Sequence, residues 1–123
     1  MTDQYTKAPP SLHKAISHQL ELILENPDFK ATPPQIAFLK FIVNQALAGK
    51  SREISDYTVA TEVFDRGPDF DQLIDPIVSI QADILRRALA RYYKNTGKND
   101  PIQIEIPNGT YVPMFKKQKL KEP

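Results

Sequence analysis

Residues 75–95 read DPIVSIQADILRRALARYYKN, with apolar side chains at every third or fourth position. This spacing predicts one amphipathic helix from Pro76 to about Asn95. Asp75 is expected to cap the helix, with Pro76 in its first turn, and Gly97 is expected to end it. At 1.5 Å per residue the helix would be roughly 30 Å long, which makes it the longest in the chain.

A β-hairpin is predicted directly after the long helix. In residues 102–106 isoleucine alternates with polar side chains, which is typical of a half-buried strand. Asn108-Gly109 is typical of a two-residue hairpin turn, and residues 110–115 would supply the returning strand. Tyr111 and Phe115 are expected to pack beneath this hairpin, because aromatic side chains at alternate strand positions usually mark the buried face.

Three shorter helices are predicted before the long one. Residues 12–25 carry leucine and isoleucine at helical spacing, and this helix is expected either to cover the domain or to form a dimer contact. Thr32-Pro33 opens a helix that reaches about Ala48 and is expected to be the core helix. Ser55-Asp56 opens a short third helix, which Gly67-Pro68 ends.

The length of 123 residues fits a single domain. Residues 1–11 are polar and contain two prolines, so they are expected to form a flexible arm. Residues 12–115 would form the domain, and residues 116–123, KKQKLKEP, a flexible basic tail. The predicted fold class is therefore mainly α with a small β-hairpin: a winged helix-turn-helix with an extra N-terminal helix.

The composition excludes several classes of function. No apolar run approaches the roughly 20 residues of a membrane span, and no apolar leader is present, so we expect a cytoplasmic protein without a membrane partner. The chain has no cysteine, and its two histidines, His13 and His18, lie five positions apart. We therefore expect no metal, no cofactor and no small-molecule ligand. No nucleophile motif is present either, so no catalytic residue and no enzyme activity are expected.

The charges are unevenly distributed along the chain. From Leu20 to Asp83 there are five Lys and Arg against eleven Asp and Glu, a net charge of −6. From Ile84 to Lys121 there are nine against two, a net charge of +7. A strongly basic C-terminal third is compatible with a phosphate-binding surface, although a solvated charged helix followed by a basic tail would give the same pattern.

Two pieces of sequence resemble a known family. Residues 78–89, VSIQADILRRAL, and residues 102–115 around Asn108-Gly109-Thr110-Tyr111 resemble the recognition helix and wing of OmpR/PhoB-type DNA-binding domains. From about Leu20 to Lys116 the chain is similar to an uncharacterised relative of that module, found at the front of larger bacterial regulatory proteins. The resemblance implies a stand-alone winged helix that binds duplex DNA as a small bacterial transcriptional regulator.

The resemblance also implies a recognition surface on the long helix, and the helical rotation of 100° per residue sorts its side chains. The side chains expected on the exposed face are Ser79, Asp83, Arg86, Arg87, Ala90 and Lys94. Those expected on the buried face are Ile77, Ile84, Leu85, Ala88, Leu89 and Tyr92. Phosphate contacts are expected from Arg86, Arg87, Arg91 and Lys94, and base contacts from Ser79 or Asp83. The hairpin and tail would add Asn108, Thr110, Lys116 and Lys117.

Two functions from different classes stay open. One is sequence-specific or architectural binding of duplex DNA. The other is a non-catalytic protein-interaction module, in which the acidic loop and the first helix bind a partner or the domain forms a homodimer. Asp83 bears on the choice, because a carboxylate facing DNA repels phosphate unless it accepts a hydrogen bond from a cytosine amino group.

Overall fold

The predicted long helix is confirmed. The computed structural model describes residues 5, 6 and 8–118, and α4 runs without a break from Ile77 to Lys94. It follows α1 (His13–Glu25), α2 (Pro33–Leu47) and α3 (Asp56–Glu62), with short 3-10 turns at Pro10–Leu12 and Ser51–Glu53. Strands β1 (Tyr5–Thr6), β2 (Ile102–Glu105) and β3 (Met114–Lys117) complete a mainly helical fold with a small antiparallel sheet. In the described part of the chain, no helix combines the length and the apolar character needed to cross a bilayer.

Two predicted helix starts are confirmed by their hydrogen bonds. At α2, Thr32 Oγ1 accepts a hydrogen bond from the backbone N–H of Gln35, and Gln35 Oε1 accepts one from the N–H of Thr32. Ser55 and Thr58 form the same reciprocal pair at the start of α3. Each pair satisfies two backbone N–H groups that the helix leaves free, so both starts are fixed by local sequence.

The start of α4 differs from the prediction. Pro76 occupies the N-cap position, and Asp75 does not cap the helix. The Asp75 carboxylate instead accepts a hydrogen bond from Arg66 Nε at 2.6 Å, while Arg66 Nη1 donates to the carbonyl of Phe64. The predicted cap is wrong because the carboxylate has a cationic partner across the loop. This ion pair closes the base of the α3–α4 loop, residues 63–76.

The sheet has the strand order β1-β3-β2, so β3 lies in the middle. It pairs antiparallel with β2, from Ile102 opposite Lys117 to Glu105 opposite Met114. It also pairs antiparallel with β1, where Tyr5 lies opposite Lys116. The isoleucines of β2 and the ring of Phe115 are buried, so one face of the sheet points into the core.

The hairpin between β2 and β3 turns at the predicted residues, but its ladder is shorter than predicted. Gly109 has φ +86°, and the Thr110 N–H donates to the Pro107 carbonyl, so Asn108-Gly109 occupies the turn. The returning strand begins at Met114 rather than at residue 110. Pro107 and Pro113 have no N–H to donate to a ladder, which explains why pairing stops at Glu105 and Met114.

The structure also differs from the predicted flexible ends. Tyr5 and Thr6 form β1, and residues 10–12 form a 3-10 turn, so these parts of the expected arm belong to the fold. Lys116 and Lys117 belong to β3, and Gln118 Nε2 donates to the Asp100 carbonyl at 2.7 Å. The remainder of the predicted arm and tail, residues 1–4, 7 and 119–123, lies outside the described residues.

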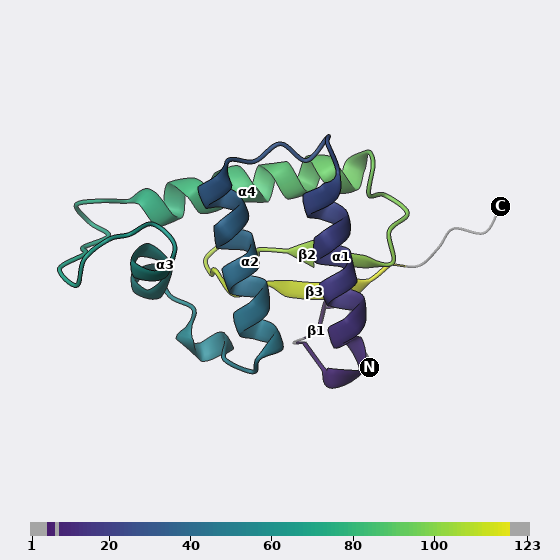
Figure 1. Cartoon of the computed structure of the whole chain (residues 1–123), viewed down its shortest axis with the longest axis horizontal. Coiled ribbons are helices and arrows are strands. Elements are labelled where there is room, and N and C mark those ends of the chain that lie inside the picture. The colour runs from purple at the N-terminus through teal and green to yellow at the C-terminus, as the bar shows by residue number, and fades with distance from the viewer. Residues whose placement is uncertain (1–4, 7, 119–123) are drawn as a thin grey trace.

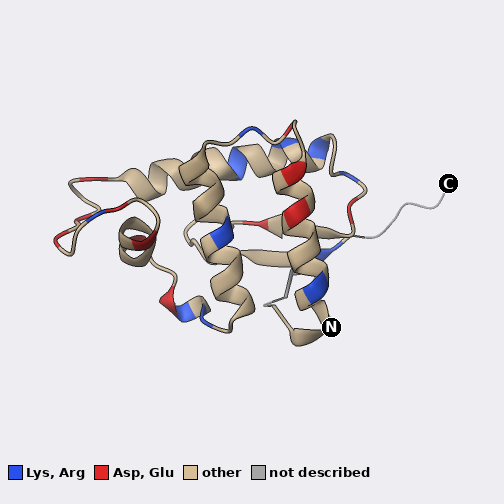
Figure 2. Cartoon of the chain, viewed as in Figure 1, with Lys and Arg blue, Asp and Glu red and all other residues tan. Residues whose placement is uncertain are grey.

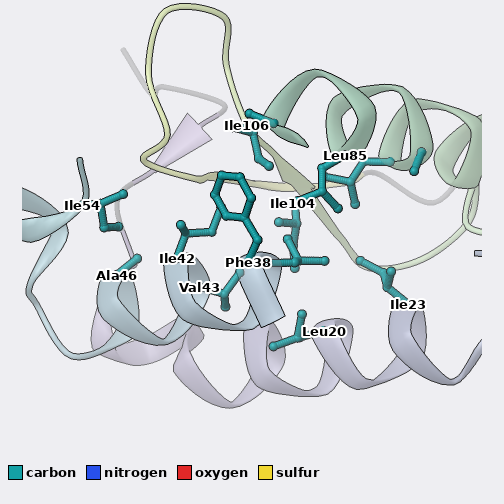
Figure 3. Close-up of a cluster of buried hydrophobic side chains, with 14 of the residues drawn as sticks. Leu20, Ile23, Phe38, Ile42, Val43, Ala46, Ile54, Leu85, Ile104 and Ile106 are labelled. Atoms are coloured by element: carbon teal, nitrogen blue, oxygen red, sulfur yellow. The ribbon is translucent and has the colours of Figure 1, made fainter. Parts of the chain in front are cut away.

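The core lies between the sheet and the helices. Figure 1 shows α1 and α2 side by side in front of the sheet, with α4 running crosswise behind them. The ring of Phe38, from α2, is fully buried and lies among Ile42, Ile104 and neighbouring side chains (Figure 3). Ile16 and Ile23 of α1 are fully buried as well. The apolar stripe of α1 is therefore covered by the domain itself.

Candidate nucleic-acid interface

The exposed face of α4 is the candidate binding surface. Apart from the neighbours Ala90 and Arg91, its exposed side chains follow one another at steps of three or four residues: Ile80, Asp83, Arg87, Ala90, Arg91 and Lys94. The first half of this face is apolar and acidic, whereas the second half carries three cations. Figure 2 shows the corresponding blue segments along α4, towards its C-terminal end. The positive charge of α4 thus lies in its second half, from Arg86 to Lys94.

These three cations meet the sheet at an open hollow. Arg87, Arg91 and Lys94 line a space of about 590 Å³, and Gln103 of β2 and Gln118 line it from the other side. The structure forms two ion pairs among the described residues, and neither includes any of the three cations. The hollow therefore presents positive charge and amide groups together, an arrangement suited to the oxygens of an anion.

A second groove, of about 300 Å³, runs between α4 and β2 beside this hollow. Ala90, Tyr93 and Gln103 line both spaces, so they adjoin. Glu105 and Asn108 line only the second groove. Because Glu105 places a carboxylate there, the anion-binding character is confined to the hollow near the end of α4.

Arg86 is placed differently from the other predicted contacts. Its side chain is only 17% exposed, and its guanidinium points at the hairpin. Nε donates to the carbonyl of Ile106 at 3.0 Å, and Nη2 donates to those of Pro107 and Thr110 at 3.2 and 2.8 Å. These carbonyls lie in the connection beyond the β2–β3 ladder. Arg86 thus holds the hairpin turn against α4, and a phosphate contact from it stays a prediction.

The two side chains predicted to read bases already have partners. The Asp83 carboxylate accepts a hydrogen bond from Arg86 Nη1 at 2.6 Å, although it remains 59% exposed. Ser79 is half-buried, and its hydroxyl donates to the carbonyl of Pro76. A base contact from either would have to compete with these bonds.

The hairpin and tail residues divide into exposed and partnered groups. Asn108 is exposed at the turn, whereas Thr110 is half-buried and its Oγ1 accepts a hydrogen bond from the Val112 N–H. Lys117 is exposed at the end of β3. Lys116 is half-buried and lies opposite Gln103 in the sheet, which places it on the face that borders the hollow.

Tyr93 has a role that its position in the sequence did not suggest. β2 is an edge strand, and an edge leaves backbone groups without strand partners. The Tyr93 hydroxyl accepts a hydrogen bond from the N–H of Ile104 and donates to the carbonyl of Ile102, both at 2.9 Å. Tyr93 follows Arg86 by seven residues, or two helical turns, so the two side chains secure the same strand and its turn. No local sequence signal identifies these two roles, because both depend on β2 lying at the edge of the sheet.

The stability of the fold is expected to fall as the pH rises above about 10, the ordinary pKa of tyrosine. Burial raises the pKa of Tyr93, and burial together with Asp100 raises that of Tyr92. Both hydroxyls therefore stay protonated in the folded chain at pH values where they ionise in the unfolded chain. The free energy of unfolding consequently falls as the pH rises.

Tyr93→Phe tests this directly. It should cost about 1–3 kcal/mol at pH 7, because two backbone groups lose their partner, and should weaken the fall in stability between pH 9 and 11. Denaturant unfolding across this range measures both effects, with Tyr57→Phe, at an exposed ring, as the control. An unchanged pH dependence in Tyr93→Phe would contradict the assignment.

A buried polar cluster fixes the chain that follows α4. Gln19 of α1 is fully buried, and its Nε2 donates to Asp100 Oδ2 at 2.8 Å. The Tyr92 hydroxyl donates to the same carboxylate oxygen. Gln118 Nε2 donates to the Asp100 carbonyl, so the cluster also positions a side chain that lines the hollow.

The predicted faces of α4 are only partly reproduced. Leu85, Ala88, Leu89 and Tyr92 are buried as predicted, but Ile77 and Ile84 are half-buried. Val78 and Ala82 are fully buried in their place. The buried face of α4 therefore lies to one side of the predicted one, with Val78 and Ala82 inside it and Ile77 and Ile84 at its edge. Val78, Ala82, Leu85, Leu89 and Tyr92 follow one another at steps of three or four residues, so the helical rotation does group them on one face.

The described residues contain no group of three or more His, Cys, Asp or Glu side chains placed to hold a metal ion. The polar groups that converge on the α4 hollow are cationic or amide groups, which suit an anion rather than a cation. Comparison with known proteins gives no match: no family model matches the chain, and neither does any curated protein or any solved structure.

Proposed function

We propose that the chain binds duplex DNA as a winged helix-turn-helix, with α3 and α4 as the helix pair and the β2–β3 hairpin as the wing. The observation that carries the proposal is the hollow in which Arg87, Arg91 and Lys94 face solvent together. The hairpin that follows α4 is held beside this helix by Arg86, as a wing would be.

The spacing of the three cations suits a phosphate backbone. Arg87 and Lys94 are seven residues apart, or about 10 Å along α4, and Arg91 lies between them. A duplex carries about six phosphates over the same length of its axis. Lys116 and Lys117 of β3 would extend the contact from the sheet, and Asn108 would extend it from the hairpin turn.

The carboxylate of Asp83 would repel DNA phosphates less strongly than an unpaired carboxylate. Its carboxylate is paired with Arg86 at 2.6 Å, so part of its negative charge is balanced. The exposed residues in the first half of α4 nevertheless include no arginine or amide side chain that could bind a base edge through two hydrogen bonds. Phosphate contacts would therefore dominate, which favours architectural binding by a small regulator over strong sequence discrimination.

A salt titration tests the proposal. The logarithm of the binding constant should fall linearly with the logarithm of salt concentration, with a slope of about −0.9 for each phosphate contact. The triple variant Arg87→Ala, Arg91→Ala, Lys94→Ala should flatten that slope by up to about 2.7 units on every duplex tested. Fluorescence anisotropy with random and genomic duplexes measures both quantities.

The control is the double variant Lys14→Ala, Lys40→Ala, which removes two exposed lysines from α1 and α2. It should leave the slope within about half a unit of that of the wild type, because those helices do not border the hollow. If wild type binds no duplex at low salt, where the electrostatic attraction is greatest, the proposal of DNA binding fails.

A further inference from the structure

The α3–α4 loop holds two apolar side chains out in solvent. Leu73 is 92% exposed and Ile74 is 82% exposed, and they are neighbours in the chain. The loop conformation is nonetheless fixed by side-chain interactions. Its base is closed by the ion pair of Arg66 and Asp75, and the Leu73 N–H donates to Asp71 Oδ1 at 2.9 Å. Two neighbouring apolar side chains held outward in this way form a candidate surface for binding a partner.

Leu73 is one wall of a hollow of about 560 Å³ at the junction of the loop and α3. The aromatic rings of Tyr57 and Phe70 form further walls. The carboxylates that line the same hollow come from Asp56, Asp69 and Asp71, and no Lys or Arg is among the lining residues. A space with apolar walls and carboxylates at its rim fits a side chain that is apolar along its stem and cationic at its tip.

Ile74 borders a second, smaller hollow on the same loop. This space has a volume of about 280 Å³, and Phe70, Asp69 and Asp71 line both hollows. The loop therefore offers two adjoining positions, one beside Leu73 and one beside Ile74, with carboxylates between them. Figure 2 shows the acidic residues of this loop in red, at the end of the molecule away from the C-terminal end of α4.

We propose that the α3–α4 loop docks a segment of another protein in which an arginine or lysine stands next to a large aliphatic residue. The alkyl stem of the cation would pack on Tyr57 and Leu73, and its charged group would reach the carboxylates of Asp69 and Asp71. The aliphatic neighbour would cover Ile74. This docking is independent of DNA binding, because the loop precedes α4 and the basic hollow lies near the other end of that helix.

The basic hollow of a second copy is a poorer occupant. It is lined by Arg87, Arg91 and Lys94 with alanine, tyrosine and glutamine, and contains no leucine or isoleucine. That surface could satisfy the carboxylates of the loop but would bring no aliphatic side chain to Leu73 or Ile74. A segment that carries a cation beside an aliphatic side chain matches both the charge and the apolar character of the loop.

The test uses the full chain and a probe peptide of alternating arginine and leucine, nine residues long. Backbone amide NMR signals of residues 69–74 should shift with added peptide and saturate. Peptides with glutamate in place of arginine, or glutamine in place of leucine, should not give a saturable shift there. The double variant Arg87→Ala, Arg91→Ala should bind the peptide as wild type does. A failure of DNA binding and a failure of docking therefore remain distinguishable.

Two loop variants separate the charge and apolar contributions. The double variant Asp69→Asn, Asp71→Asn keeps an acceptor for the Leu73 N–H. It should raise the Kd for the peptide about fivefold, as expected for the loss of two exposed charge pairs. Leu73→Ser, Ile74→Ser should raise it at least about tenfold. Both changes lie on exposed side chains, and unchanged unfolding temperatures would show that the fold is intact.

Three outcomes would overturn the proposal. The first is the absence of a saturable shift at residues 69–74 with the arginine–leucine peptide. The second is equal binding of that peptide by wild type and Leu73→Ser, Ile74→Ser. The third is a concentration-dependent shift of the loop signals without peptide that Leu73→Ser, Ile74→Ser abolishes, which would assign the surface to a second copy of the chain.

Discussion

Replacing Gly97 with alanine is expected to lower the free energy of unfolding by about 3 kcal/mol, the upper part of the usual range for overpacking. A Cβ at this position would lie 2.8 Å from Cζ of Tyr92 and closer still to two other ring atoms, within a separation that real Cβ atoms do not reach. The ring cannot simply move aside. Its hydroxyl is bound to Asp100, and its faces and edges meet the rings of Phe29 and Tyr93.

Thermal unfolding measures this effect, because 3 kcal/mol corresponds to a fall of about 12 °C in Tm for a chain of this size. Gly49→Ala and Gly109→Ala are the matched controls. Both glycines have positive φ, and a Cβ on either would meet no atom within 4 Å. Each control should therefore show only a backbone cost of about 1–2 kcal/mol. Equal losses at all three positions would contradict the steric explanation for Gly97.

Arg86→Lys is expected to destabilise the fold by about 2 kcal/mol, and Arg86→Ala by about 3 kcal/mol. The guanidinium binds three carbonyls of the hairpin connection at once, together with the carboxylate of Asp83. A lysine keeps the charge but has a single nitrogen, which cannot reproduce the fork that reaches all of these oxygens. The carbonyls of Ile106, Pro107 and Thr110 would be left without this donor.

This pair of variants also separates two roles for Arg86. If its main role is to hold the hairpin, Arg86→Lys should increase amide hydrogen exchange in residues 106–112 and weaken DNA binding on every duplex without changing the salt slope. If Arg86 instead contacts phosphate, the lysine should preserve both stability and most of the affinity. Arg87→Lys, on the exposed side of α4, is the control and should leave stability unchanged.

The elements that the sequence predicts well are those whose partners are local. The start of α2 depends on Thr32 and Gln35, three residues apart, and both of their reciprocal bonds are present. The length of α4 follows from its own apolar spacing. The prediction of Asp75 as a cap was wrong because Arg66, nine residues away across a loop, donates a hydrogen bond to its carboxylate. Capping preferences describe only residues next to the helix start, so they do not include this competing partner.

The candidate site was predicted less completely, for the same physical reason. A helical rotation places Arg87 and Lys94 on the exposed face, where the structure also has them. It cannot reveal that Arg86 binds the hairpin, because the carbonyls that accept its hydrogen bonds come from residues 20 to 24 positions later. Tyr93 was missed because its hydroxyl binds the backbone of an edge strand, and the order of strands in the sheet cannot be predicted from the local sequence.

The central place of β3 in the sheet sets the order in which the domain can assemble. β3 joins residues near the beginning of the chain, at Tyr5, to residues near its end, at Lys116. Neither β1 nor β2 has a strand partner until β3 arrives, although the helices between them can form from local contacts. Closing so long a segment carries the largest loop-closure entropy in the fold, and contacts of this sequence separation form slowly. The pairing of β1 is therefore expected to be the last step of folding, whereas the α4 hollow consists of residues between Arg87 and Gln118 and needs no contact with β1.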